Sequence, residues 1–259
     1  LPVFPKTLGR ERKLVKDQGA SLSCTAQTVT GAAERQDKME LSAAFTWKEE
    51  CKKLGNYIPN GADPRTALNV GIEIGFLLDQ DAPFRFPRDD EQVIGNWTNW
   101  PDHLTQMAED QKKAAYIRVP KIGDWFDSIR AALVRGQIRD QEVMAFTRWR
   151  ASWNQTFIPG VETNDQIGGH AYRIIDFDTI EGEEYLVVQN SYGENFGDRG
   201  FQYMPREAAN RVFSEWGSGA FVYEDLPPGA IAEAKKDTPF GALWRSILKA
   251  WAFIMIKYG

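Results

Sequence analysis

The sequence predicts an α+β fold of two subdomains, with a helical front half, a strand-rich back half and a cleft between them. Apolar residues recur at helical spacing before residue 105, and short runs typical of strands gather after it. The 259 residues are 42% hydrophobic and 26% charged, and they include 9 Trp, 8 Tyr and 15 Phe. This composition is typical of a globular protein with a substantial core, so disorder and fibrous repeats are excluded.

The helices are expected mainly in the front half, at about 18–105. Thr, Val and Gly residues in segment 25–39 lower its helix propensity, so a helix there would need tertiary support. A clearer helix runs from Ser42, its predicted N-cap, to Leu54, with Phe45 and Cys51 facing inward. Two further segments have helical spacing or a helix start signal, at 66–76 and 125–135.

The strands are expected in the back half, at about 106–225. Four apolar or β-branched runs predict them, at 141–146, 170–177, 184–189 and 200–203. Irregular structure is expected at 1–17, at 56–64 and, because three prolines interrupt the chain, through 79–110.

Charge and cysteine content exclude several function classes. The formal net charge of -5 argues against a nucleic-acid partner, which usually requires a basic excess. No run approaches the ~20 apolar residues of a membrane span. Two cysteines cannot form a disulfide framework for a chain of this size, so we expect a soluble, reduced protein. Since the chain starts at Leu1 and no secretory segment is visible, a processed or trimmed form is expected.

The last segment, 226–259, differs from the rest of the chain. It follows a Pro-Pro-Gly break and carries five basic and two acidic residues. Apolar residues recur in it at three- and four-residue spacing, which predicts an amphipathic helix at 239–258. Packing on the protein itself, docking to a membrane surface and docking to a protein partner all remain open for this helix.

Three short motifs carry the candidate chemistry. The first is Gln18-Gly19 followed by Ser23-Cys24, and the second is Gly168-Gly169-His170-Ala171 at the start of a predicted strand. The third is Asn190-Ser191-Tyr192-Gly193. His170 follows Cys24 by 146 residues and Asn190 follows it by 166. A lone Cys is usually a small buried hydrophobe, so the indication lies in the order and flanks of all three motifs.

In these motifs the sequence resembles the papain-like cysteine peptidases. Residues 60–68 also resemble the family's Asn-Gly-Gly loop, with Ala62 in place of the second glycine. The Gly-Gly-His-Ala form is most similar to the cathepsin B branch, but the region of that branch's paired histidines holds only His103. The resemblance therefore implies an endopeptidase with a papain-like fold, a helical left subdomain and a β-barrel-like right subdomain, over residues 1–225.

The resemblance assigns a role to each matching residue. Cys24 would be the nucleophile, forming a thioacyl-enzyme, and His170 the general acid and base. Asn190 would orient the imidazole, and Gln18 would donate a hydrogen bond to the oxyanion. Four further residues would contact substrate, namely Gly61, Ala62, Gly169 and Tyr192. A polypeptide is the expected substrate, and no cofactor is implied.

Several positions depart from the family pattern. Thr25 follows Cys24 where Trp is usual, and Tyr192 stands where Trp shields the Asn–His hydrogen bond. Ser21 and Pro59 replace two half-cystines, and we expect Cys51 to be a buried free thiol rather than a partner of Cys24.

The sequence also leaves two alternative functions open and bears on a metal site and on the compartment. The fold could serve a catalytically inactive interaction protein that docks through its C-terminal helix, or an acyl transferase that uses the same thiolate. An acidic hairpin at 176–184 is expected to be solvated, and no metal site is expected, because only two histidines exist. Missing disulfides favour a reducing compartment or an injected or particle-associated protein, whereas the family favours secretion or lysosomes.

Overall fold

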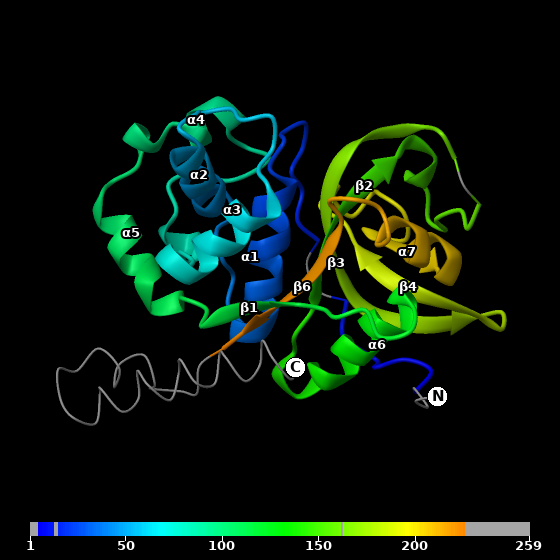
Figure 1. Ribbon diagram of the computed structural model, residues 1–259. Coiled ribbons are helices and arrows are strands. Elements are labelled where there is room, and N and C mark those ends of the chain that lie inside the picture. Colours follow the sequence, from blue (N-terminus) through cyan, green and yellow to red (C-terminus); the bar gives the residue numbers. More distant parts are fainter. Residues whose placement is uncertain (1–4, 13–14, 162, 226–259) are drawn as a thin grey trace, which may run out of the picture.

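The computed structural model describes residues 5–12, 15–161 and 163–225. Helices occupy one half and an antiparallel sheet the other, with the two halves side by side (Figure 1). The predicted helix at 239–258 lies outside the described residues, so it stays a prediction. The α-helices are α1 Cys24–Asp37, α2 Ala43–Leu54, α3 Pro64–Asn69, α4 Glu91–Gly95, α5 His103–Met107, α6 Trp125–Arg135 and α7 Arg206–Val212.

The helical half is built around α1 and α2. Helix α2 begins as predicted, because the Ser42 side chain accepts a hydrogen bond from the Phe45 backbone N–H, 3.1 Å away. Phe45 and Cys51 face the core of this half, where both are fully buried. The helix predicted at 66–76 is instead α3 followed by a π-helical turn, Val70–Ile74.

The other half is one six-stranded antiparallel sheet in the order β1-β6-β2-β3-β4-β5. Two strands, β1 and β6, are absent from the prediction because each is short and carries little alternation. Helices α6 and α7 pack on this half (Figure 1). The strands are β1 Ala115–Arg118, β2 Val143–Arg150, β3 Gln166–Ile180, β4 Glu183–Gln189, β5 Phe201–Pro205 and β6 Gly219–Glu224.

Helix α1 joins the two halves, since it packs on α2 on one side and on β3 and β2 on the other. Residues 25–33 of this helix are all buried. The Arg173 guanidinium, from β3, donates to the Gly31 carbonyl and to Glu142. A Cβ on Gly31 would lie 2.6 Å from the Arg173 guanidinium carbon, so a glycine is required for this close approach. Tertiary packing thus stabilises a segment of weak intrinsic propensity.

The prediction that the acidic hairpin is solvated is wrong at its first residue. Asp176 is 6% exposed. Its carboxylate accepts hydrogen bonds from the Leu8 and Arg10 backbone N–H groups and from the Thr7 hydroxyl. The irregular N-terminal segment needs a partner for its backbone donors, which a sequence pattern alone does not reveal. Asp176 therefore fastens that segment to β3.

The described residues contain no helix that is long and apolar enough to cross a membrane. Cys24 and Cys51 are both free thiols, and the Cys51 thiol donates to the Tyr57 carbonyl across 3.4 Å.

Candidate active site

Cys24 is the first residue of α1 and lies where the helix meets the sheet. The turn before it is held by buried side chains, since the Ser21 hydroxyl contacts the Ser23 hydroxyl at 2.7 Å and donates to the Gln18 carbonyl. The first backbone N–H groups of a helix have no partner inside the helix, and the positive end of its dipole favours a nearby negative charge. Cys24 is partly exposed. The position at the start of α1 therefore favours a thiolate at Cys24, an effect that burial of the thiol opposes.

His170 and Asn190 come from neighbouring strands of the sheet. His170 lies on β3 opposite Thr147 of β2, and Asn190 directly follows β4. The imidazole Nε2 lies 2.8 Å from the Asn190 side-chain oxygen. That oxygen can only accept, so Nε2 carries the hydrogen and Nδ1 carries the lone pair of the neutral ring. Asn190 is fixed in turn, because its side-chain amide donates to Gln202.

Three aromatic rings surround the imidazole, namely those of Tyr192, Trp149 and, with centroids 6.1 Å apart, Tyr172. The Tyr192 ring lies within 16° of parallel to it, with centroids 5.0 Å apart, and its hydroxyl oxygen is 3.4 Å from Nδ1. Trp149 contacts the imidazole edge to face at 4.8 Å. With the hydrogen on Nε2, Nδ1 is an acceptor, so the Tyr192 hydroxyl can donate to it across this long contact. Sequence reasoning missed Trp149, since its place depends on the register of β2 and β3.

Burial governs the ionisation of both reactive groups. It lowers the pKa of His170 to about 4, and the hydrogen bond that His170 donates to Asn190 offsets only part of this effect. It also raises the pKa of Cys24 to about 11; the Ala171 backbone N–H opposes this shift and the charge of Glu50 adds to it. Within the described part of the chain, no hydrogen bond joins Cys24 to His170. Burial therefore favours the neutral thiol and the neutral imidazole in the absence of substrate.

Glu50 is a second residue that the sequence analysis missed. It is fully buried on α2, and its carboxylate accepts a hydrogen bond of 2.7 Å from the Thr25 hydroxyl. Burial raises the pKa of Glu50 to about 8. Thr25, which stands where the family has Trp, thus links α1 to α2 directly behind the nucleophile. Charged residues inside a predicted helix are ordinarily assigned to its exposed face, so the pattern gave no signal.

Gln18 is buried, and it contacts Ser191, the residue between Asn190 and Tyr192 in the chain. Its side-chain oxygen accepts from the Ser191 hydroxyl at 2.6 Å, and its amide nitrogen donates to the Ser21 carbonyl at 2.7 Å. An amide carries two N–H donors, so one remains for a ligand. Gln18 is not among the residues that line the hollow in front of Cys24.

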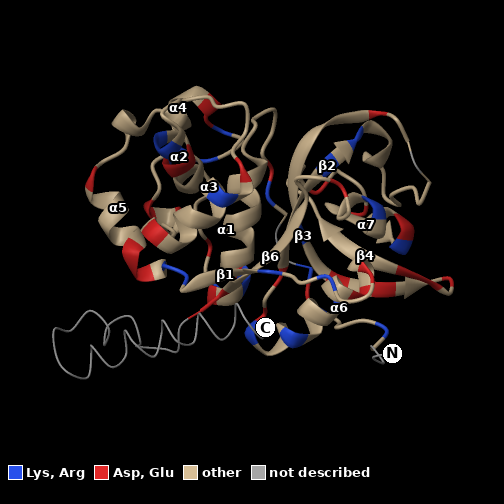
Figure 2. Ribbon diagram, in the orientation of Figure 1, with Lys and Arg blue, Asp and Glu red and all other residues tan. Residues whose placement is uncertain are grey.

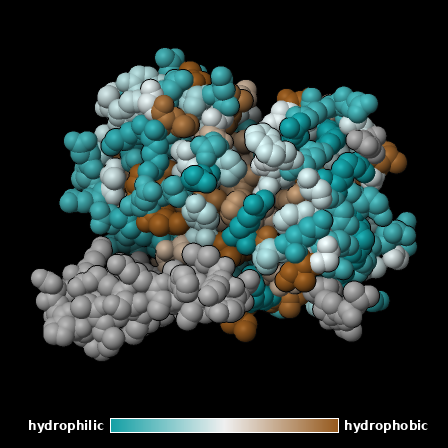
Figure 3. Space-filling model, in the orientation of Figure 1, coloured by the Kyte–Doolittle hydropathy of each residue, from teal (hydrophilic) through white to brown (hydrophobic). Residues whose placement is uncertain are grey.

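The hollow in front of Cys24, called the front hollow below, has a volume of about 410 Å³. Five of the predicted site residues line it. Asn190 and Tyr192 do not line it, but both contact His170. Figure 3 shows the face on which the two halves meet, with neutral and weakly apolar surface between them. The predicted residues in the lining are Cys24, Gly61, Ala62, Gly169 and His170.

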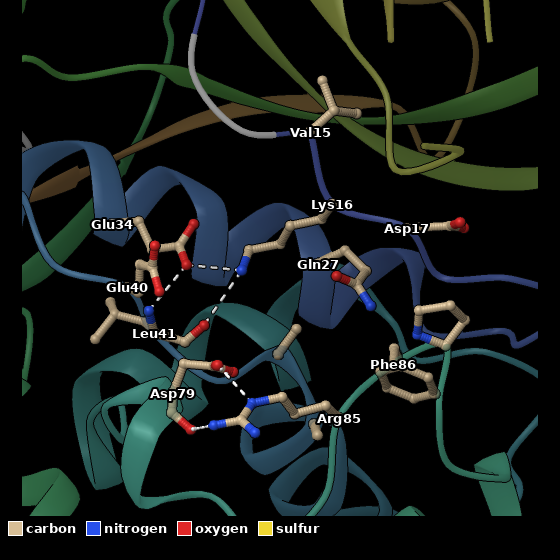
Figure 4. Close-up of a pocket in the computed structure, with 13 residues that line it drawn as sticks. Val15, Lys16, Asp17, Gln27, Glu34, Glu40, Leu41, Asp79, Arg85 and Phe86 are labelled. Carbon is tan, nitrogen blue, oxygen red and sulfur yellow. Dashed lines mark hydrogen bonds and ion pairs between the residues drawn. The ribbon is translucent and has the colours of Figure 1, made fainter. Parts of the chain in front are cut away.

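A separate hollow of about 300 Å³ lies between the N-terminal segment and helices α1 and α2 (Figure 4). Two ion pairs lie in its lining: Lys16 pairs with Glu34 at 2.7 Å, and Arg85 pairs with Asp79 at 2.6 Å. None of the predicted site residues lines this hollow. Because Cys24 and His170 line the front hollow instead, the front hollow is the candidate active site.

Comparison with known proteins gives a family match over most of the chain. A family model described as "Papain family cysteine protease" matches residues 8–216. Cathepsin S of Mus musculus is 25% identical over 209 residues, which are 76% of this chain and 56% of that protein. "Probable cysteine protease RDL5" of Arabidopsis thaliana is 27% identical over 206 residues, 76% of this chain and 50% of that protein. The chain thus spans about half the length of these curated relatives, and they do not confirm the cathepsin B branch.

Solved structures share the fold. Xylellain, a cysteine protease from Xylella fastidiosa, matches with a TM-score of 0.71 and 22% identity over 87% of this chain and 88% of that one. A cysteine protease of Carica candamarcensis, solved in complex with E-64, matches with a TM-score of 0.60 and 16% identity over 86% of this chain and 100% of that one. The predicted fold class is confirmed by these likenesses.

Proposed function

Since the chain belongs to the papain family of cysteine proteases, we propose that it is a cysteine endopeptidase that cleaves polypeptides through a Cys24 thioacyl-enzyme. The observation that carries the proposal is the placement of Cys24 and His170 in one hollow, with Asn190 holding the imidazole from behind. In this scheme Cys24 and His170 are catalytic residues. Asn190 is a positioning residue, because it acts through the imidazole.

The reaction follows from the tautomer that Asn190 imposes. With its hydrogen on Nε2, His170 accepts the thiol proton of Cys24 at Nδ1 as the sulfur attacks the substrate carbonyl carbon. The C–N bond then breaks, and Nδ1–H gives its proton to the departing amine. Water then attacks the thioester carbon while His170 takes a proton from it. The C–S bond breaks and releases the carboxylic acid, and His170 returns its proton to the sulfur, which regenerates the Cys24 thiol. Because burial disfavours both charges, the imidazolium forms as the reaction proceeds rather than beforehand.

Two donors would stabilise the oxyanion that forms during attack. One is the backbone N–H of Cys24 at the start of α1, and the other is the second side-chain N–H of Gln18. Removal of one such donor costs roughly 2.7–4 kcal/mol in known hydrolases. Gly61, Ala62 and Gly169 would contact the substrate from the walls of the front hollow.

The alternatives have no specific observation in their favour. An inactive interaction protein would not require all four residue types, and an acyl transferase would differ only in its final acceptor. The role of segment 239–258, the division near residue 105 and the compartment stay predictions, although two free thiols are compatible with reducing conditions.

The test compares three forms of the reduced protein, namely wild type, Cys24→Ala and the matched control Cys51→Ala, which removes the buried thiol. Intact mass spectrometry after brief exposure to E-64 should show one adduct on wild type and Cys51→Ala and none on Cys24→Ala. Cleavage of a denatured protein substrate should follow the same order. A folded wild type with neither an adduct nor cleavage would sink the proposal.

A further inference from the structure

The side chains that line the front hollow and its neighbour carry more positive than negative charge. Among the described residues that line it, Arg148 is the one Lys, Arg, Asp or Glu. A second hollow of about 670 Å³ shares Pro64 and residues 216–218 with the first and adds Arg118, Lys121 and Glu215. We call the two together the extended cleft. Its lining holds three cations and one anion, although the whole chain has a net charge of -5.

The Arg148 charge is only weakly compensated. Its side chain is 44% exposed, and Nη1 donates to the neutral Gln166 side chain across 2.9 Å. The nearest carboxylate oxygen is Glu215 Oε2, 3.9 Å from Nε, which is beyond hydrogen-bond distance. The other oxygen of Glu215 binds the buried Arg150. The guanidinium of Arg148 therefore keeps donors for a further acceptor in the hollow.

The second part of the extended cleft has two more exposed cations. Arg118, at the end of β1, donates to the Ser218 carbonyl across 3.2 Å. Lys121 lies in the segment that leads from β1 to α6, where Figure 2 shows basic residues. Within the described ranges neither residue forms an ion pair. The acidic residue of this hollow, Glu215, is already bound by Arg150.

We propose that the substrates of this protein carry acidic side chains on the N-terminal side of the scissile bond. This proposal rests on the peptidase function proposed above. The papain-family resemblance implies that the loop of Gly61 and Ala62 pairs with substrate backbone on that side, and both residues line the same hollow as Arg148. An acidic side chain near the scissile bond binds Arg148, and a second one farther along binds Arg118 or Lys121.

The physical reason is the placement of Arg148: its charge is partly removed from water, and no carboxylate among the described residues binds it closely. Arginine presents a planar fork of donors that matches a carboxylate, and such charge-assisted bonds are stronger than neutral ones. An exposed ion pair contributes little, whereas the walls of the hollow partly shield Arg148 from water. A Glu peptide is therefore expected to be cleaved roughly fivefold to tenfold more efficiently than its Gln counterpart.

The test uses fluorogenic peptides that differ only by Glu, Gln or Lys at one position, scanned on both sides of the scissile bond. The enzymes are wild type, Arg148→Gln, Arg148→Glu and the control Lys38→Gln, which removes one exposed positive charge from the C-cap of α1. Wild type and the control should favour Glu on the N-terminal side alone. Arg148→Gln should lose that preference, Arg148→Glu should shift it to Lys, and added salt should weaken it.

A binding measurement separates this proposal from the peptidase proposal. Anisotropy of labelled Glu and Gln peptides on Cys24→Ala needs no hydrolysis, so it reports on the cleft even if the chain cleaves nothing. Tighter binding of the Glu peptide that disappears in the double variant Cys24→Ala/Arg148→Gln supports the proposal. Equal affinities for the two peptides, or a preference that Arg148→Gln leaves intact, overturn it.

Discussion

At the scale of single residues, the surroundings of His170 decide its chemistry. Asn190 binds Nε2, Tyr192 covers one face of the ring, and Trp149 presents its edge. Together they exclude water, which is why the pKa of His170 falls to about 4. The proton on Nδ1 therefore exists mainly during the reaction.

Two substitutions of Tyr192 separate the contribution of its ring to activity from that of its hydroxyl. We expect Tyr192→Phe to change kcat/KM by no more than about threefold, because the stacked ring remains and the 3.4 Å hydroxyl contact is long. Tyr192→Ala should lower kcat/KM by tenfold or more, because water then reaches the His170–Asn190 hydrogen bond.

Steady-state kinetics with one peptide substrate would measure both variants, with circular dichroism to confirm folding. If Tyr192→Phe instead lost as much activity as Tyr192→Ala, the hydroxyl and not the ring would be the important group.

At the scale of elements, α1 depends on side chains from its neighbours. Its sequence includes two threonines and a valine in succession, which favour other conformations, yet the helix runs 14 residues. Thr25 donates to Glu50, and Thr30 donates to Thr46, both on α2. On the other side of α1, the Gly31 carbonyl accepts a hydrogen bond from the Arg173 guanidinium of β3. The helix that carries Cys24 is therefore rigid because it is buried between two layers.

Glu50 gives this packing a dependence on pH. Its pKa is raised from 4.5 to about 8 in the folded protein, so the folded state retains a proton that the unfolded chain loses. The free energy of unfolding should then be highest below pH 4.5 and fall as the pH rises toward 8, on the order of 1 kcal/mol per pH unit from this group. Glu50→Gln should remove this part of the slope.

Urea unfolding between pH 5 and 8 would measure the effect, with the exposed Glu73→Gln as control. A Glu50→Gln variant that keeps the wild-type slope would show that this carboxyl ionises normally in the folded protein.

At the scale of the whole molecule, the N-terminal segment connects the two halves. Its early residues bind Asp176 on β3, and Arg10 also donates to the Leu133 carbonyl of α6. Farther along, Lys16 binds Glu34 on α1. The segment thus contacts the sheet, a helix of the strand-rich half and the helical half in turn, and it then leads into the turn before Cys24. Its attachment is expected to stabilise the relative position of the two halves.

Asp176→Ala should detach the start of this segment. The carboxylate accepts three hydrogen bonds from residues 7–10, and their loss should lower the free energy of unfolding by about 2–4 kcal/mol. The backbone amides of Leu8 and Arg10 should also exchange with solvent faster.

Hydrogen exchange and urea unfolding would check both effects, with Asp178→Ala as the control two residues along the same strand. Equal protection of Leu8 and Arg10 in wild type and Asp176→Ala would mean that the segment is held by other contacts.

Local sequence determined the elements whose signals are complete within a few residues. Helix α6 begins and ends where the Gly-Asp start signal and apolar spacing predict, and α2 begins at the Ser42 cap. Strands β3 and β4 follow from long apolar runs, although β3 extends beyond both predicted ends. The order and flanking residues of three motifs, with the family resemblance they carry, predicted Cys24, His170 and Asn190 as a set.

Tertiary structure decided everything that depends on which segments meet. The contacts of Trp149 with His170, of Glu50 with Thr25 and of Asp176 with residues 7–10 join parts of the chain 21 to 169 positions apart. Strands β1 and β6 are placed by pairing between distant segments, since β6 lies between β1 and β2 in the sheet. The candidate residues for the proposed chemistry were therefore readable from local motifs. Their burial, and hence their pKa values and the charge of the cleft, required the folded chain.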